Sequence, residues 1–193
     1  MTTAAVVLAA GGSRRLGQPK QLLAYRGATL LDATVATARS AGVDQVVVAL
    51  GGSADQVRET VDLSGVEVVL NPDFGDGCAT SIRTALARVR DDVDGVVLLL
   101  GDQPGVVPES VRALVAGRGG AELAVCRYED GRGHPFAFAR SVFGDLADLH
   151  GDKGVWKLLD RAGDAVAEVP VSGPIPPDVD TWEDYEAALT RRA

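Results

Sequence analysis

The first twenty residues constrain the fold of this chain more than any other segment. An apolar run, Ala4 to Ala10, leads directly into a loop that is rich in glycine and in basic side chains, Gly11 to Lys20. The run is typical of a buried strand, and glycines, which lack Cβ atoms, allow backbone N–H groups to converge on an anion. The segment therefore predicts a strand and loop that bind a nucleotide or another polyphosphate.

Two well-known phosphate-binding loops are excluded by spacing. The pattern Gly-x-x-x-x-Gly runs from Gly12 to Gly17, but Gln18 and Pro19 stand where a Walker loop requires Lys followed by Ser or Thr. The dinucleotide fingerprint Gly-x-Gly-x-x-Gly does not start at Gly11 or Gly12, which argues against a Rossmann dehydrogenase. A turn with a solvated basic face is the simpler alternative, but three cations and three glycines in ten residues favour a phosphate site.

The charge distribution favours a small anionic ligand. The net charge is −8, whereas a nucleic-acid partner requires a broad basic surface. Residues 1–43 carry five basic side chains against Asp32 alone, a net charge of +4, so the other 150 residues carry −12. Positive charge is thus local to the loop, where it can concentrate a small anion on an acidic protein.

Other bulk properties limit the domain organisation and the location. No segment approaches the ~20 apolar residues of a membrane span, and the N-terminus lacks the basic residues of a signal peptide. Cys78 and Cys126 are too few for a disulfide framework, and with two separated histidines they argue against a zinc site. We expect one domain over residues 1–193, in the cytoplasm, with no membrane and no nucleic acid as partner.

Apolar segments alternate with helical ones along the chain. The pattern predicts strands at 4–9, 44–50, 66–70, 94–100, 122–128, 134–139 and 165–169, and helices at 29–41, 53–62, 78–89, 108–116, 140–148, 152–161 and 181–191. The first four strands are continuous and rich in Val and Leu, as in a parallel sheet covered on both faces. The short connection 129–133 predicts an antiparallel hairpin. The fold class is therefore α/β, a Rossmann-like three-layer sandwich with a mainly parallel mixed sheet.

Two acidic segments could hold a metal ion. Asp102 lies just past the carboxyl end of the strand predicted at 94–100. Ligands of open α/β sheets bind at that edge, which the loop 10–20 also leaves. Mg²⁺ bound to phosphates needs only one or two protein carboxylates. An Asp-initiated turn before Pro104 explains Asp102 equally well. In the second segment, 178–185, helix capping by Asp180 or Thr181 explains the residues better than metal binding does.

Two further segments carry polar side chains that could contact a substrate. Asn71 to Ser81 leaves a strand and opens a helix, so it could bind a base, a ribose or a second substrate, although a capped loop is an equally good explanation. His134 begins the second strand of the hairpin, where a structural turn histidine is as good an explanation as a substrate contact.

In chain order these segments resemble the MobA-like nucleotidyltransferases. Leu8 to Lys20 is similar to the signature Leu-Ala-Ala-Gly-x-Ser-x-Arg-Met-Gly-x-x-Lys, with Leu16 in place of Met. Further similarities are Gly101 to Pro104, Gly-His-Pro at 133–135, Gly-Asp-x-Gly at 151–154, and Asp178 to Tyr185. The resemblance is strongest to the molybdenum cofactor cytidylyltransferase branch, and it implies the nucleotide-diphospho-sugar transferase type of the fold.

The resemblance also implies a reaction and a set of site residues. Such enzymes transfer CMP from CTP to the terminal phosphate of molybdopterin and release pyrophosphate, with Mg²⁺ as cofactor; Ala10 points to CTP rather than GTP. The implied catalytic residues are Arg15, Lys20 and Asp102, and the implied metal ligands are Asp102 and Asp180. The implied nucleotide contacts are Leu8, Ala10, Gly11, Gly12, Ser13, Arg14, Gly17, Lys20, Asn71 and Ser81, and the implied acceptor contacts are His134 and Asp152.

Two other functions stay open at this point. One is a nicotine-blue-type NAD(P)H oxidoreductase of the same superfamily, and the other is a non-catalytic protein that binds a nucleotide or a cofactor. Under the transferase interpretation the partners are CTP and a molybdopterin-type cofactor, with a molybdenum hydroxylase or its maturation chaperone as a candidate protein partner.

Overall fold

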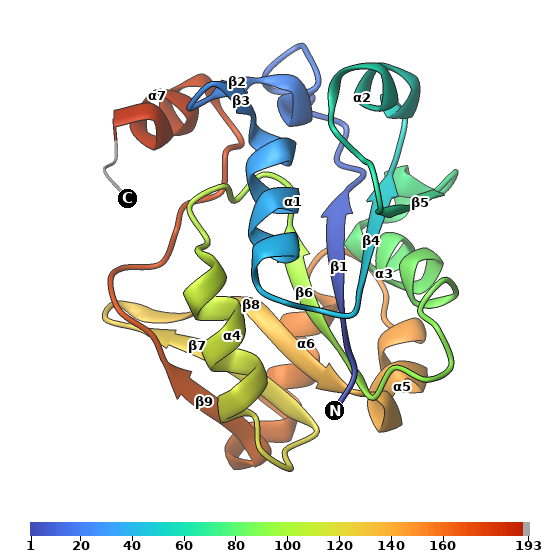
Figure 1. Ribbon diagram of the computed structural model, residues 1–193, viewed down its shortest axis with the longest axis vertical. Helices are drawn as coiled ribbons and strands as arrows, with labels where there is room; N and C mark the ends of the chain where they lie inside the picture. Colours follow the sequence, from blue (N-terminus) through green and yellow to red (C-terminus); the bar gives the residue numbers. More distant parts are fainter. Residues whose placement is uncertain (191–193) are drawn as a thin grey trace.

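A seven-stranded sheet in the order β5-β4-β1-β6-β8-β7-β9 forms the centre of the protein. The computed structural model describes residues 1–190 (Figure 1). The strands are β1 (Thr3–Ala9), β4 (Gln45–Leu50), β5 (Glu67–Leu70), β6 (Gly95–Leu100), β7 (Leu123–Tyr128), β8 (Gly131–Ala139) and β9 (Val166–Pro170). The first four in chain order are parallel, β8 is antiparallel to both β6 and β7, and β9 is parallel to β7.

Helices cover both faces of this sheet because its central strands are apolar on both sides. Every residue of β1 is buried, and alternate side chains enter two separate core clusters. One cluster packs under α1 (Leu30–Ser40), α2 (Ala54–Thr60) and α4 (Pro108–Gly117), and the other under α3 (Cys78–Leu86), α5 (Phe143–Ala147) and α6 (Gly154–Ala162). The predicted α/β three-layer sandwich is confirmed.

A third core cluster joins the two ends of the chain. The last helix, α7 (Trp182–Thr190), lies beside a small hairpin of β2 (Ala24–Tyr25) and β3 (Ala28–Thr29), as Figure 1 shows. Val179 is fully buried in this cluster together with Leu16 and Leu30, and the hydroxyl of Tyr185 donates to the carbonyl of Ala24 at 2.6 Å. This packing brings the segment before α7 back to the N-terminal loop.

The predicted elements agree with the structure except at their ends. β8 starts three residues earlier than expected, so the hairpin connection shrinks to residues 129–130. The helix predicted at 140–148 is a 3-10 turn (Arg140–Val142) followed by α5. The helix predicted at 181–191 starts at Trp182, and residue 191 lies outside the described residues. The β2–β3 hairpin was not predicted, because strands of two residues carry no periodicity.

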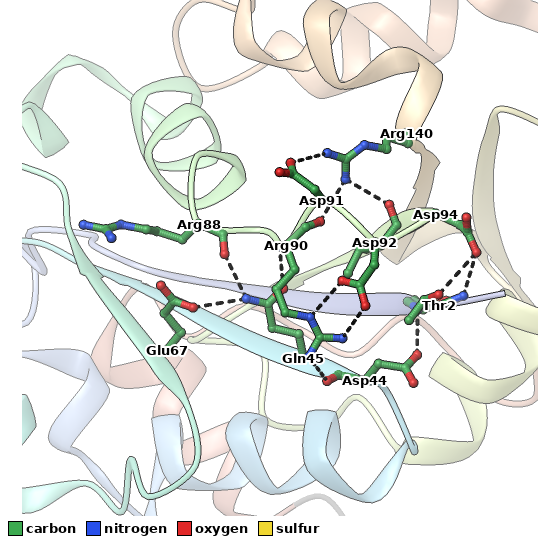
Figure 2. A network of polar contacts seen from close by, with 12 residues as sticks. Thr2, Asp44, Gln45, Glu67, Arg88, Arg90, Asp91, Asp92, Asp94 and Arg140 are labelled. Carbon is green, nitrogen blue, oxygen red and sulfur yellow. Dashed lines mark hydrogen bonds and ion pairs between the residues drawn. The ribbon is translucent and has the colours of Figure 1, made fainter.

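The amino ends of the strands are tied together by a polar network (Figure 2). The carboxylate of Asp94 accepts from the backbone N–H of Thr2 at 2.8 Å. The side chain of Gln45 bonds the backbone of both Arg88 and Arg90, at 2.8 and 3.0 Å. The network fixes the start of β1, β4 and β6, and it leaves the opposite edge of the sheet, where the strands end, to the candidate site. None of the helices in residues 1–190 has the length and hydrophobicity that a bilayer span requires.

Candidate active site

A cavity of about 480 Å³ opens where β1 and β6 end. Its lining combines the glycine-rich loop with the opening of α3 and three acidic side chains: Leu8, Ala10, Gly11, Gly12, Ser13, Arg14, Arg15, Lys20, Phe74, Gly75, Gly77, Cys78, Ser81, Leu100, Asp102, Asp152 and Asp180. The loop and Asp102 thus share one edge of the sheet. Most of the predicted site residues meet here, but Gly17, Asn71 and His134 do not line this cavity.

The glycine-rich loop has a defined conformation. Ser13 has a φ of 48°, in the left-handed region that costs a non-glycine residue energy, and Gly17 has a φ of 69°. The carbonyl of Ser13 accepts from the N–H of Gly17 at 3.2 Å, and its hydroxyl accepts from the N–H of Lys20 at 2.9 Å. Gly17 therefore closes the turn rather than lining the cavity, and Ser13 fixes the backbone from which the Lys20 side chain extends.

Gln21 fastens the start of this loop and was missed by the sequence analysis. Its side chain is 4% exposed, and Nε2 donates to the carbonyl of Ala9 at 2.7 Å and to that of Gly11 at 3.1 Å. These bonds connect the end of β1 to the first turn after the loop. The sequence shows only that an amide side chain follows the loop. It does not show whether that side chain is buried or which carbonyl groups it contacts.

Lys20 lies between two carboxylates. Its Nζ contacts Oδ2 of Asp102 and lies 2.7 Å from Oδ1 of Asp180. Burial by itself would lower the pKa of Lys20, but the two carboxylates outweigh that effect and raise the pKa above its usual value. Arg15 is more distant, with Nη1 at 3.8 Å from Oδ2 of Asp180, and its side chain is 71% exposed. Lys20 is therefore charged and carries the main cationic contact of the site.

Backbone and amide contacts hold Asp180 next to Asp102. The carbonyl of Asp102 accepts from the N–H of Val179 at 2.9 Å, and Nε2 of the buried Gln103 donates to the carbonyl of Pro176 at 2.5 Å. Loss of solvation and the charges of Asp102 and Asp180 raise the pKa of Asp178 to about 6. Negative charge is thus concentrated at this end of the cavity.

Helix α7 is capped by residues other than Asp180. The N–H of Thr181 donates to Oδ2 of Asp184 at 2.8 Å, and the N–H of Asp184 donates to the hydroxyl of Thr181 at 3.2 Å, which is a capping box. The side chain of Asp180 makes no capping bond among the described contacts and points to Lys20 instead. Asp180 therefore contacts the ammonium group of Lys20 and does not cap α7.

The opening of α3 is organised by side chains beneath and beside the cavity. Asn71 is 2% exposed, and its Nδ2 donates to the hydroxyls of Thr80 and Ser81, each at 2.9 Å. Asn71 therefore lies behind the cavity lining and orients Ser81. Its own side chain does not line the surface that a nucleotide would contact. Asp152 lines the cavity, and its Oδ1 accepts from the N–H of Cys78, the first residue of α3, at 3.0 Å.

His134 belongs to an aromatic cluster beside α6. Its ring centroid lies 3.9 Å from that of Phe136 and 6.3 Å from that of Trp156. Burial lowers the pKa of His134 to about 3, so the ring is neutral at physiological pH. Its carbonyl accepts from the hydroxyl of Tyr128 at 2.7 Å. These contacts explain His134 by packing and do not bring it to the cavity lining.

Phe74 forms a cavity wall that the sequence analysis did not single out. A Cβ atom added to Gly52 would lie 2.8 Å from Cζ of Phe74, and one added to Gly51 would lie 2.5 Å from the carbonyl oxygen of Ala10. The two glycines after β4 therefore permit the Phe74 ring and the glycine-rich loop to approach closely. A flat, partly exposed ring beside the loop is a surface on which a base or a sugar could lie.

Two carboxylates, rather than a cluster of three or more ligands, are available to a metal ion. Residues 1–190 contain no group of three or more His, Cys, Asp or Glu side chains that could hold one. The oxygens of Asp102 and Asp180 converge on one ammonium group, and oxygen donors suit Mg²⁺ and Mn²⁺. Because nucleotide phosphates and water complete the coordination of such ions, a pair of carboxylates fits a metal that arrives with a nucleotide.

One protein family and two relatives match most of this chain. The family described as MobA-like NTP transferase domain matches residues 5–166. Nicotine blue oxidoreductase of Paenarthrobacter nicotinovorans is 31% identical over 163 residues, which cover 80% of this chain and 79% of the relative. Purine catabolism protein PucB of Bacillus subtilis (strain 168) is 31% identical in an alignment of 201 positions, which covers 97% of this chain and 95% of the relative.

Solved structures are also similar. Rv0371c from Mycobacterium tuberculosis H37Rv has a TM-score of 0.94 and 53% identity, with 98% of each chain covered. A complex of Rv0371c with manganese has a TM-score of 0.89 and 50% identity, again with 98% of each chain covered. A nucleotidyl transferase from Methanothermobacter thermautotroptrophicus has a TM-score of 0.82 and 27% identity, covering 97% and 96%. The predicted nucleotide-diphospho-sugar transferase type of the fold is thereby confirmed.

Proposed function

The chain belongs to the family of MobA-like NTP transferase domains, and on that premise we propose that it transfers CMP from CTP to the terminal phosphate of a molybdopterin-type cofactor and releases pyrophosphate. The observation that carries the proposal is the meeting of the glycine-rich loop, Lys20, Asp102 and Asp180 in one cavity. Ala10, which resembles the residue of the pyrimidine users, supports CTP as the donor. The whole chain, residues 1–193, acts as one catalytic domain in this proposal.

Each half of the cavity has a task in this reaction. The backbone of residues 11–17, with Arg14, Arg15 and Lys20, binds the triphosphate and absorbs the charge that builds up on the departing pyrophosphate. Ser13 and Gln21 hold the loop in place for this task through the bonds to Lys20, Ala9 and Gly11. Fixed positions for the reacting phosphates lower the entropic part of the barrier.

Asp102 and Asp180 would hold the divalent metal, proposed as Mg²⁺. When bound, such an ion neutralises phosphate charge and orients the attacking oxygen. The manganese complex of the similar protein Rv0371c supports a divalent metal for this chain. The acceptor is a phosphate monoester with a second pKa of about 6, so it is ionised at neutral pH and needs no strong general base. Asp152, which lines the cavity, and His134, which packs against Phe136 and Trp156 outside the lining, remain our proposed acceptor-side residues.

A second candidate function follows from the 31% identity to nicotine blue oxidoreductase. That protein's name describes redox chemistry, which would need a reductant in or near the same cavity. The loop between β1 and the Lys20 turn lacks the spacing of the dinucleotide fingerprint. The cationic side chains and the two carboxylates favour a triphosphate and a metal, so the transferase is the better supported of the two. A non-catalytic nucleotide-binding protein would not require both carboxylates beside Lys20.

We further propose that the protein is a cytoplasmic enzyme that delivers its product to a molybdenum hydroxylase or its maturation chaperone.

One assay separates these functions. The purified protein is incubated with Mg²⁺, molybdopterin cofactor and CTP, GTP, ATP or UTP, and pyrophosphate is measured. We expect release with CTP, and Lys20→Ala and Arg15→Ala should each reduce turnover by about 10²-fold or more. Lys157→Ala, which removes an exposed lysine of α6, is the matched control and should keep full turnover. Absence of pyrophosphate with every nucleotide would exclude the transferase, and NAD(P)H oxidation with a quinoid dye would favour the oxidoreductase.

A further inference from the structure

The ammonium group of Lys20 fills the gap between Asp102 and Asp180. It contacts one carboxylate and lies 2.7 Å from the other. The side chains of Lys20 and Asp102 are only 11% and 20% exposed, so solvent screens their interaction weakly. The same gap is the place where the proposed function requires a divalent metal. A monovalent and a divalent cation a few ångströms apart repel each other strongly in such a setting.

The two carboxylates are held in place by contacts that do not involve Lys20. The N–H of Val179 bonds the carbonyl of Asp102 at 2.9 Å, and Gln103 bonds the carbonyl of Pro176 at 2.5 Å. Val179 itself is fully buried. The spacing of the carboxylates is therefore a property of the two backbone segments. Removal of the Lys20 charge would leave two negative groups facing each other and available to another cation.

The side chain of Lys20 also lies close to the glycine-rich loop. A Cβ atom added to Gly11 would lie 3.5 Å from Cε of Lys20, so the end of the aliphatic stem lies against Gly11 of the glycine-rich loop. The backbone of Lys20 is fixed by the hydroxyl of Ser13. Rotation about the last side-chain bonds would therefore carry Nζ from the carboxylates toward the loop, where the triphosphate binds in the proposed function. Such rotamer changes are fast compared with turnover.

Building on the proposed function, we propose that Lys20 is an internal counter-cation that occupies the Asp102–Asp180 pair until a nucleoside triphosphate arrives. The phosphates offer the ammonium a new anionic partner, and its departure opens the carboxylate pair to the divalent metal. The metal therefore binds together with the nucleotide and not before it. Metal binding without nucleotide is weak in this arrangement because the resident cation must first be displaced.

Titration with Mn²⁺ alone tests this proposal, with free Mn²⁺ followed by electron paramagnetic resonance. Lys20→Met keeps most of the stem and removes the charge, and we expect it to bind Mn²⁺ at least about tenfold more tightly than the unsubstituted protein. Lys20→Arg keeps the charge and should bind weakly. Lys157→Met is the matched control, because Lys157 is exposed on α6 and does not line the cavity, and it should change Mn²⁺ affinity little. Addition of Asp102→Asn to Lys20→Met should abolish the gain. If Lys20→Met binds Mn²⁺ no more tightly than the unsubstituted protein, the counter-cation role is wrong.

A second measurement follows Lys20 directly in the unsubstituted protein and uses a variant only to assign its signal. The chain contains three lysines, at positions 20, 153 and 157, so ¹³Cε-labelled lysine gives a simple NMR spectrum in which Lys20→Arg identifies the Lys20 signal. With a metal chelator present, CTP should shift that signal, whereas Mg²⁺ alone should not. A shift with Mg²⁺ alone that equals the shift with CTP would overturn the proposal. Neither experiment uses turnover, so failure of the pyrophosphate assay would remove the transferase function and leave these results to be judged separately.

Discussion

Replacing Asp180 and Asp184 by alanine, one at a time, separates metal binding from helix capping in the segment before α7. The two side chains are four residues apart and have the same chemistry, but the structure gives them different contacts. Asp184 accepts from the N–H and the hydroxyl of Thr181, both at 2.8 Å. Asp180 contacts Lys20 at 2.7 Å and makes no capping bond among the described contacts. Each variant is therefore the control for the other.

The expected magnitudes follow from these contacts. Thr181 is the N-cap residue and Asp184, the third helical residue, completes the capping box, so Asp184→Ala loses the bonds from the N–H and the hydroxyl of Thr181. This loss should cost about 1 kcal/mol, which lowers the melting temperature of a chain of this size by about 2–4 °C. The side chain of Asp180 is 48% exposed, and an ion pair of that exposure contributes about 0–1 kcal/mol. In Asp180→Ala, Lys20 keeps Asp102 as partner and repulsion among the carboxylates decreases, so the stability should change by less than about 0.5 kcal/mol.

The functional readout should show the reverse order. Calorimetric titration with Mg²⁺ and CTP should give an affinity at least about tenfold lower for Asp180→Ala, because one of the two metal ligands is lost. Asp184→Ala should keep the affinity of the unsubstituted protein. Thermal unfolding without metal measures the stability term in the same samples. If Asp180→Ala lowered the melting temperature as much as Asp184→Ala and kept normal Mg²⁺–CTP affinity, Asp180 would be a structural residue and the reasoning would be refuted.

Two further predictions concern the loop support and the neutral histidine. Gln21→Leu removes the bonds to Ala9 and Gly11, which should lower the free energy of unfolding by about 1–3 kcal/mol. Part of this loss is offset, because the substitution also removes Oε1, which is buried and has no partner among the described residues. Thermal unfolding measures the stability and titration with CTP measures the affinity; if both stay unchanged, Gln21 does not hold the loop. Burial lowers the pKa of His134 to about 3, so below its unfolded pKa of about 6.5 the unfolded chain binds one more proton, and stability should fall with falling pH by up to about 1.4 kcal/mol per pH unit. His134→Gln should flatten this dependence between pH 6.5 and pH 4 in denaturant unfolding, and parallel curves for the two proteins would contradict the prediction.

The fold could be predicted from the sequence to the extent that it is local. Continuous runs of Val and Leu mark the parallel strands because both faces are buried, and the short connection before β8 marks the hairpin. The pairing of β9 with β7 is not encoded in any local pattern, because it depends on where α5 and α6 return the chain. The β2–β3 hairpin escaped for a related reason. Its strands are too short for periodicity and are fixed by packing against α7.

The candidate site divides in the same way. Spacing in the loop and the position of Asp102 after a strand are local signals, and both led to the cavity. Asn71 shows where local signals end, because an amide at the end of a strand does not reveal whether it faces a ligand or the hydroxyls of Thr80 and Ser81. Asp180 is an intermediate case. The sequence offered two caps for α7, Asp180 and Thr181, and the structure uses Thr181, which forms a capping box with Asp184.

Asp180 reaches the cavity because the segment before α7 packs against the N-terminal part of the chain. The family match ends at residue 166, before the segment that supplies this carboxylate. Val179 brings the segment back by filling a core cluster formed mainly by residues 16–30 and α7, while its N–H bonds the carbonyl of Asp102. One buried residue thus couples the packing of α7 to the distance between the two carboxylates. A substitution that enlarges or empties this position should therefore disturb the site through Asp180, even though Val179 does not line the cavity.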